Sequence, residues 1–102
     1  MNVECKNINN VLHIYLQGEL DEYTAKFTRE ILDSTFLKEK FNEVIFDFEN
    51  LEFMDSTGIG VLIGRYKNLK SRSKGIYIMN PNPTIEKIMK MSGIYEIMPK
   101  IS

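Results

Sequence analysis

Residues 53–60 contain the side chains best placed to do chemistry, because Asp55, Ser56 and Thr57 stand where an apolar run gives way to a helical pattern. The apolar run covers residues 44–48, and the helical pattern continues to about Lys70. The first N–H groups of a helix have no partner within the helix, and together with the helix dipole they attract negative charge. We therefore predict that Asp55 caps this helix and that Ser56 is a site of reversible phosphorylation rather than a catalytic residue.

A catalytic serine is the first alternative. The nucleophile elbow of hydrolases has glycine two residues before and two residues after the serine; Gly58 fits this pattern, but Met54 does not. His13 is the one histidine, and it lies on the strand face opposite Leu12 and Ile14. A neighbouring aspartate cannot act on a neutral hydroxyl as a positioned imidazole does. The sequence therefore predicts no catalytic residue and no enzyme activity.

Nucleotide binding is the second alternative, since Gly58, Gly60 and Gly64 follow a predicted strand. Their spacing departs from the dinucleotide fingerprint because position 63 is isoleucine, and Asn80 stands near the place where an acid would hold the ribose. No Walker sequence for nucleoside triphosphates occurs either. A small nucleotide-binding protein is thus the less favoured function.

A basic cluster follows the same helix. Cations complement the dipole at a helix C-terminus, and no exposed aromatic residue is interleaved to stack on bases. We interpret the cluster as a solvated helix end and expect no nucleic-acid partner. Its members are Arg65, Lys67, Lys70, Arg72 and Lys74.

Composition indicates one globular domain, which we place at residues 1–102, with 43% hydrophobic and 26% charged residues. The net charge of −1 gives no general attraction to nucleic acid. No apolar stretch is long enough to span a bilayer, and the start does not resemble a signal peptide. The single Cys5 suits a reducing cytoplasm. With Cys5 and His13 as the only soft ligands, we expect no metal and no cofactor.

The hydrophobic periodicity predicts an α/β fold with a mostly parallel sheet of four to five strands, packed with helices. Two short strands, 3–6 and 11–17, should form an N-terminal antiparallel hairpin. A loop at 18–21 precedes a helix that begins near Tyr23. A strand covered on both faces follows around residues 44–48, then the helix after Ser56 and a strand at 75–79. Thr84 is expected to cap a last helix that ends at Gly93, and residues 94–98 to return to the sheet.

The helix after Ser56 has an unusual outward face. Its predicted core residues are Ile59, Leu62, Ile63, Tyr66 and Leu69. The opposite side holds Thr57, Gly60, Val61, Gly64 and Asn68. Glycine inside a helix costs roughly 0.5–1 kcal/mol relative to alanine, so two on one face need a reason. We interpret this face as a surface for close approach of a partner; close packing against the first helix is the alternative.

These residues resemble an anti-sigma factor antagonist of the STAS domain family, and residues 51–67 are especially similar to the sporulation antagonists that control a forespore sigma factor. The stretches 18–21 and 91–94 match the family as well. The resemblance implies that the unmodified protein binds an anti-sigma factor that is also a serine kinase, which releases the sigma factor. Phosphorylation of Ser56 with ATP then ends binding, and a serine phosphatase restores the protein.

By the same resemblance, Asp55 and the loop with Glu19 and Asp21 are expected to contact the kinase. Thr57 stands where the family commonly has serine or alanine, which leaves a second hydroxyl as a possible phosphate acceptor. Other STAS domains belong to transporters, stress complexes and lipid-transport machinery, so a module of a different regulatory complex is the alternative.

Overall fold

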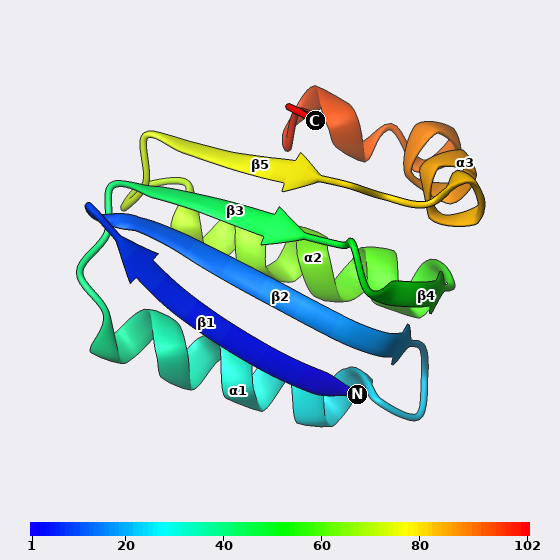
Figure 1. Cartoon of the computed structure of the whole chain (residues 1–102), viewed down its shortest axis with the longest axis horizontal. Coiled ribbons are helices and arrows are strands. Elements are labelled where there is room, and N and C mark those ends of the chain that lie inside the picture. The colour runs from blue at the N-terminus through cyan, green and yellow to red at the C-terminus, as the bar shows by residue number, and fades with distance from the viewer.

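The computed structural model describes residues 1–102 (Figure 1). The strands are β1 (Asn2–Ile8), β2 (Val11–Leu20), β3 (Glu43–Asp47), β4 (Leu51–Met54) and β5 (Gly75–Met79). The helices are α1 (Ala25–Lys38), α2 (Ser56–Leu69) and α3 (Pro83–Ser92), followed by the short 3-10 helix η1 (Ile94–Glu96). No helix has the length and apolar character required to cross a bilayer.

The strands form one mixed sheet in the order β1-β2-β3-β5, with β4 paired to β2 beyond the end of β3. β1 and β2 make the antiparallel hairpin, whose turn residues Asn9 and Asn10 have φ angles of 52° and 66°. Asparagine tolerates this left-handed conformation better than most residues. All other pairs are parallel, which confirms the predicted fold class.

One face of the sheet is covered by α1 and α2, which lie side by side behind it in Figure 1. Leu12, Ile14 and Phe46 point toward these helices and are fully buried. The other face has no helix across its centre, so His13 and Ile45 are only half-buried. The prediction that residues 44–48 are covered on both faces was therefore wrong for this strand, whose side chains alternate between the core and the open face.

The sheet departs from the sequence prediction at two places near the functional segment. Residues 18–20 are not a loop but the last part of β2, with a register irregularity beside Gly18 that lets the strand reach β4. β4 itself is an additional strand, which the sequence prediction missed because the strand is only four residues long. Short strands of mixed burial have little periodic signal.

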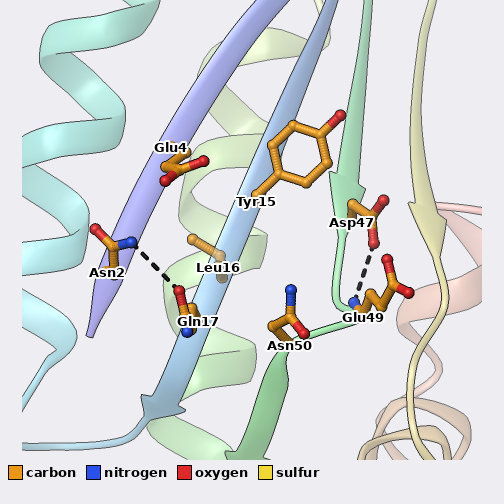
Figure 2. Close-up of a pocket in the computed structure, with 8 residues that line it drawn as sticks. All are labelled: Asn2, Glu4, Tyr15, Leu16, Gln17, Asp47, Glu49 and Asn50. Atoms are coloured by element: carbon orange, nitrogen blue, oxygen red, sulfur yellow. Dashed lines mark hydrogen bonds between the residues drawn. The ribbon is translucent and has the colours of Figure 1, made fainter.

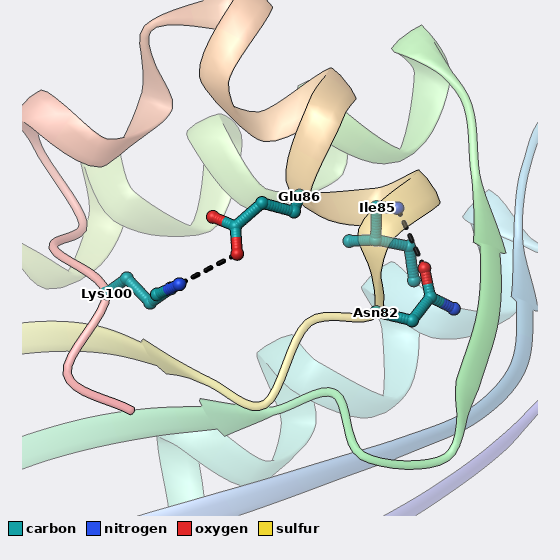
Figure 3. A network of polar contacts seen from close by, with 4 residues as sticks. All are labelled: Asn82, Ile85, Glu86 and Lys100. Carbon is teal, nitrogen blue, oxygen red and sulfur yellow. Dashed lines mark hydrogen bonds and ion pairs between the residues drawn. The ribbon is translucent and has the colours of Figure 1, made fainter.

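The C-terminal part also differs from the prediction. Asn82, not Thr84, caps α3, because its side-chain oxygen accepts from the N–H of Ile85 at 2.9 Å (Figure 3). Gly93 ends the helix with a φ of 74°, as expected. Residues 94–98 form η1 and a turn instead of a strand, and the tail after them lies along β5, where the N–H of Ile78 donates to the carbonyl of Pro99 at 2.9 Å.

Candidate functional site

The segment with Ser56 lies at the edge of the sheet where β2 and β4 end and α1 and α2 begin (Figure 1). Leu20 of β2 pairs with Met54 of β4, and the N–H of Asp55 donates to the carbonyl of Leu20 at 3.4 Å. The structure therefore brings the Glu19–Asp21 segment beside Asp55 and Ser56, although Asp55 follows Asp21 by 34 positions in the chain.

Asp55 is the N-cap of α2, as predicted. Its Oδ1 accepts from the N–H of Gly58 at 3.1 Å, and its carbonyl accepts from the N–H of Ile59 at 3.2 Å. Ser56 is the first residue of the helix and is exposed, whereas Thr57 is half-buried. The Ser56 hydroxyl thus lies at the start of a helix on the surface, where negative charge is favoured.

Asp21 has a structural task that the sequence did not show. Its Oδ1 accepts from the N–H groups of Tyr23 and Thr24, at 2.9 and 3.1 Å, in the turn that leads into α1. The Thr24 hydroxyl in turn donates to the carbonyl of Glu19 at 2.8 Å. Asp21 is half-buried, while Glu19 is exposed and free to meet a partner.

Gly58 is required by packing. A Cβ at this position would lie 2.7 Å from the carbonyl oxygen of Leu20 and 2.6 Å from Cγ of Met54. Its φ is not in the positive range, so backbone conformation does not explain this glycine. The close approach of α2 to the end of β2 explains it, which the sequence alone could not reveal.

Gly60 and Gly64 have a different environment. A Cβ at either position would meet nothing within 4 Å, so these glycines are not needed for packing inside the domain. This removes the alternative that they allow close contact with α1. Val61, in contrast, is only 2% exposed. The prediction that Val61 lies on the outward face was wrong, because α1 packs against that side of α2.

The basic cluster after α2 was also only partly predicted. Arg65 is buried and its Nε lies 2.9 Å from Oδ1 of Asp33 on α1. Arg72 donates to the carbonyl of Phe36 at 2.7 Å, and its guanidinium lies over the Phe41 ring, 5.0 Å from the ring centre. Arg65 therefore connects α2 to α1, and Arg72 connects the chain after α2 to the end of α1 and to Phe41. The lysines of the cluster are exposed, as expected.

The edge that carries Ser56 is acidic. The segments 17–24, 47–57 and 79–84, which form the loops and strand ends there, contain no lysine or arginine. Opposite charge on a partner would be attracted to this edge and would guide association. We call it the acidic edge; its acids are Glu19, Asp21, Glu22, Glu49, Glu52 and Asp55, whereas the nearby Asp47 is buried.

The two cavities lined by more than one carboxylate do not favour a nucleotide site. One at the open face of the sheet holds about 80 Å³, and Figure 2 shows Glu4, Tyr15 and Asp47 around it. Another, of about 340 Å³, is lined by Glu49 and Glu52 and by no cationic residue. Carboxylates without a cation repel the phosphates of a nucleotide. The cavity that includes Lys70 and Lys74 lies beyond the C-terminal end of α2, away from Ser56.

The side chains that a hydrolase would need are not brought together. His13 lies in the middle of β2, where it pairs with Ile45 of β3 and faces the open side of the sheet, while Ser56 begins a helix at the acidic edge. Cys5 is half-buried under α1, and burial raises the pKa of its thiol, which keeps it protonated and poorly reactive. The site is thus a surface rather than a pocket.

Comparison with known proteins agrees with this description. The STAS domain family model matches residues 2–102. The anti-sigma F factor antagonist of Paenibacillus polymyxa is 32% identical over 97% of this chain and 85% of its own length. The anti-sigma-B factor antagonist of Staphylococcus aureus is 28% identical over 96% of this chain and 90% of its own length.

Two solved structures of the anti-sigma factor antagonist SpoIIAA have 27% sequence identity to this chain. The unphosphorylated form has a TM-score of 0.77 and covers 99% of this chain and 89% of its own. The phosphorylated form, from Bacillus, has a TM-score of 0.68 and covers 99% of this chain and 92% of its own. Family model, relatives and fold lead to one conclusion. The chain belongs to the STAS domain family, and within it to the anti-sigma factor antagonists.

Proposed function

We propose that this protein binds an anti-sigma factor that is also a serine kinase, and that this binding releases a sigma factor in the cytoplasm. Phosphorylation of Ser56 ends the binding, and a serine phosphatase restores it. The observation that carries the proposal is the exposed Ser56 hydroxyl at the first position of α2, beside Asp55 on the acidic edge. The existence of a phosphorylated form of SpoIIAA supports it. Anti-sigma factor antagonists are regulatory proteins rather than enzymes.

The phosphate acts through its bulk and charge at the contact with the partner. A phosphoserine adds about −1.5 to −2 charges at pH 7, and the free N–H groups of a helix start tolerate this charge within the domain. A partner that lies directly on the Ser56 hydroxyl has no room for the added group. The switch is then a difference in affinity between two states of one surface, and no change of fold is needed.

The surface that meets the partner combines the acidic edge with the outward side of α2. Gly60 and Gly64 contribute no side chain, so the partner can approach the helix closely. Val61 is buried, so it is not part of this surface. Asp21 supports the surface indirectly, because its side chain stabilises the turn that leads into α1. We call it the docking surface; its members are Glu19, Asp55, Ser56, Thr57, Gly60 and Gly64.

The test is a phosphotransfer experiment with the anti-sigma factor encoded in the same genome. Wild-type protein, kinase and ATP should give one phosphate per chain, located at Ser56 by peptide mass spectrometry. Ser56→Ala should abolish the modification, and Thr57→Ala should leave it intact. Phosphate on Thr57 in the wild type, or none on either residue, contradicts the proposal.

A second candidate partner is an anti-sigma factor of the sigma-B type, because the Staphylococcus aureus sigma-B antagonist matches nearly the whole chain at 28% identity. Measuring the affinity for both types of anti-sigma factor from the same genome separates the two. Tighter binding to the sigma-B type supports this second candidate, whereas tighter binding to the sigma-F type supports the partner named for the Paenibacillus polymyxa relative.

A further inference from the structure

A cavity of about 190 Å³ lies between the C-terminal end of α2, the start of β5 and the residue that follows η1. Its polar lining consists of Tyr66, Lys70, Ser73 and Lys74, and none of the residues around it is acidic. Each of the other three cavities of the domain is lined by at least one carboxylate. This cavity, which we call the lysine pocket, is therefore the one whose charges attract an anion.

The donors of the lysine pocket are not engaged by the chain itself. The domain has two ion pairs, and neither includes Lys70 or Lys74. The side chains that form hydrogen bonds in this region are those of Arg72 and Ser73, so the half-buried Tyr66 has a hydroxyl without a partner in the chain. Two ammonium groups and one hydroxyl thus remain available to a ligand.

The loop between α2 and β5 is held in place by hydrogen bonds that leave these donors free. The backbone N–H of Lys74 donates to the carbonyl of Asn42 at 2.7 Å. The Ser73 hydroxyl donates to the carbonyl of Gly75, also at 2.7 Å. Lys70 and Lys74 therefore extend from a fixed backbone on either side of Ser73. A bound anion has to order only their side chains and not the loop, which lowers the entropy cost of binding.

The size and the apolar lining of the pocket restrict the ligand. Ile76, which is 4% exposed, and the half-buried Ile97 form the apolar part of the lining. The volume is below the roughly 300–1,000 Å³ of sites for larger ligands, so a whole nucleotide does not fit. Two ammonium groups match a dianion better than a single carboxylate, and a phosphate monoester carries about −1.5 to −2 charges at pH 7. The chemistry thus favours a phosphate head on a short apolar body.

We propose that the lysine pocket binds a small phosphate monoester. Lys70 and Lys74 hold the phosphate, the Tyr66 hydroxyl donates to one of its oxygens, and the apolar part of the ester lies against the two isoleucines. The pocket only binds the ester, and no bond is made or broken in it. Lys70 follows Ser56 by 14 positions, which is about 21 Å along the helix, so the site is separate from the phosphorylation site and does not depend on the proposed function.

Titration of the full chain with phenyl phosphate at constant ionic strength, followed by amide NMR, tests the site. We expect saturable shifts at residues 66–76 and 97. Lys70→Gln and Lys74→Gln should each weaken binding about three- to fivefold, and Tyr66→Phe about threefold. Lys67→Gln is the matched control, because it removes the same charge from an exposed position of α2 that does not line the pocket. It should stay within about twofold of the wild type.

Three outcomes overturn the inference. Equal weakening by Lys67→Gln, or shifts that spread over all lysines without saturating, would show general attraction of anions to a basic surface. Unchanged affinity in both Lys70→Gln and Lys74→Gln would remove the pocket as the binding site. Inorganic phosphate that binds as tightly as phenyl phosphate would show that the apolar lining contacts no ligand, which excludes an ester as the specific occupant.

Discussion

At the scale of single residues, three neighbours at the start of α2 have separate tasks. Asp55 caps the helix, Ser56 presents its hydroxyl, and Gly58 lets the helix pass close to Leu20. The acid and the hydroxyl could be assigned from sequence, because helix capping depends on local chemistry. The task of Gly58 depends on a residue 38 positions earlier, so no local pattern contains it.

Ser56→Asp is expected to abolish binding of the anti-sigma factor while the domain stays folded. A carboxylate at the first helical position is compatible with the helix dipole, so the melting temperature should fall little or rise. Amide spectra should change only near residues 19–21 and 54–60. Widespread spectral changes, or a strongly lowered melting temperature, would show that the switch acts through the fold.

Gly58→Ala and Gly60→Ala should change stability in opposite directions. The added methyl group at Gly58 meets the Leu20 carbonyl, which costs about 1–3 kcal/mol of overpacking. At Gly60 it meets open space, and better helix propensity adds about 0.5–1 kcal/mol. Urea unfolding of both variants and the wild type measures the difference. Equal effects at the two positions would contradict this account.

At the scale of elements, α2 shows what periodicity can and cannot predict. The spacing of its apolar residues predicted the helix and its extent, since burial repeats every three to four residues. It did not predict which flank α1 would cover, so Val61 and Arg65 were placed on the outside although both are buried. The position of a neighbouring helix depends on sheet order and on contacts such as Arg65 with Asp33. These arise between distant parts of the chain.

Gly60→Leu and Gly64→Leu should weaken binding of the anti-sigma factor by more than about tenfold, because each side chain fills space that the partner needs. Neither should unfold the domain, since a Cβ added at either position meets no other part of the domain within 4 Å. Ser34→Leu, at an exposed position of α1, is the control for added apolar surface. Binding and circular dichroism of the variants check this. Wild-type affinity in both glycine variants would remove α2 from the docking surface.

At the scale of the whole molecule, the mostly parallel sheet, the hairpin and the helices could be predicted from sequence, whereas β4 and the C-terminal end of the sheet could not. The last predicted strand is instead η1, and the tail beyond it is held along β5. Lys100 in this tail donates to Glu86 of α3 at 2.7 Å (Figure 3). Such a contact between a tail and a helix has no periodic signature, so the sequence could not indicate it.

The tail contact predicts a pH dependence. The hydrogen bond from Lys100 lowers the pKa of the Glu86 carboxyl. Because the pKa of Glu86 is lower in the folded state than the unfolded-state value of about 4.3, the contact stabilises the fold at pH values above about 4.3. This stabilisation is lost as the pH falls through the folded-state pKa. Lys100→Met should therefore be less stable than the wild type at pH 7, by less than about 1 kcal/mol for so exposed a pair. The two proteins should converge below pH 4.3. Thermal unfolding at pH 7 and pH 3 measures this; a difference that persists at pH 3 contradicts it.

The tail beside β5 also bears on aggregation. The N–H groups of Ile78, Asn80 and Ile101 are all used between the tail and β5, and Asn82 bonds the carbonyls of Leu51 and Glu52 on β4. β1 is then the only long strand whose whole outer side is free, since the tail covers the C-terminal end of β5. Open strand edges template fibre growth, and growth needs an open edge on both sides of each added chain. A chain with only one fully open edge can join one other copy along the length of that edge, and the pair then has no fully open edge left to extend.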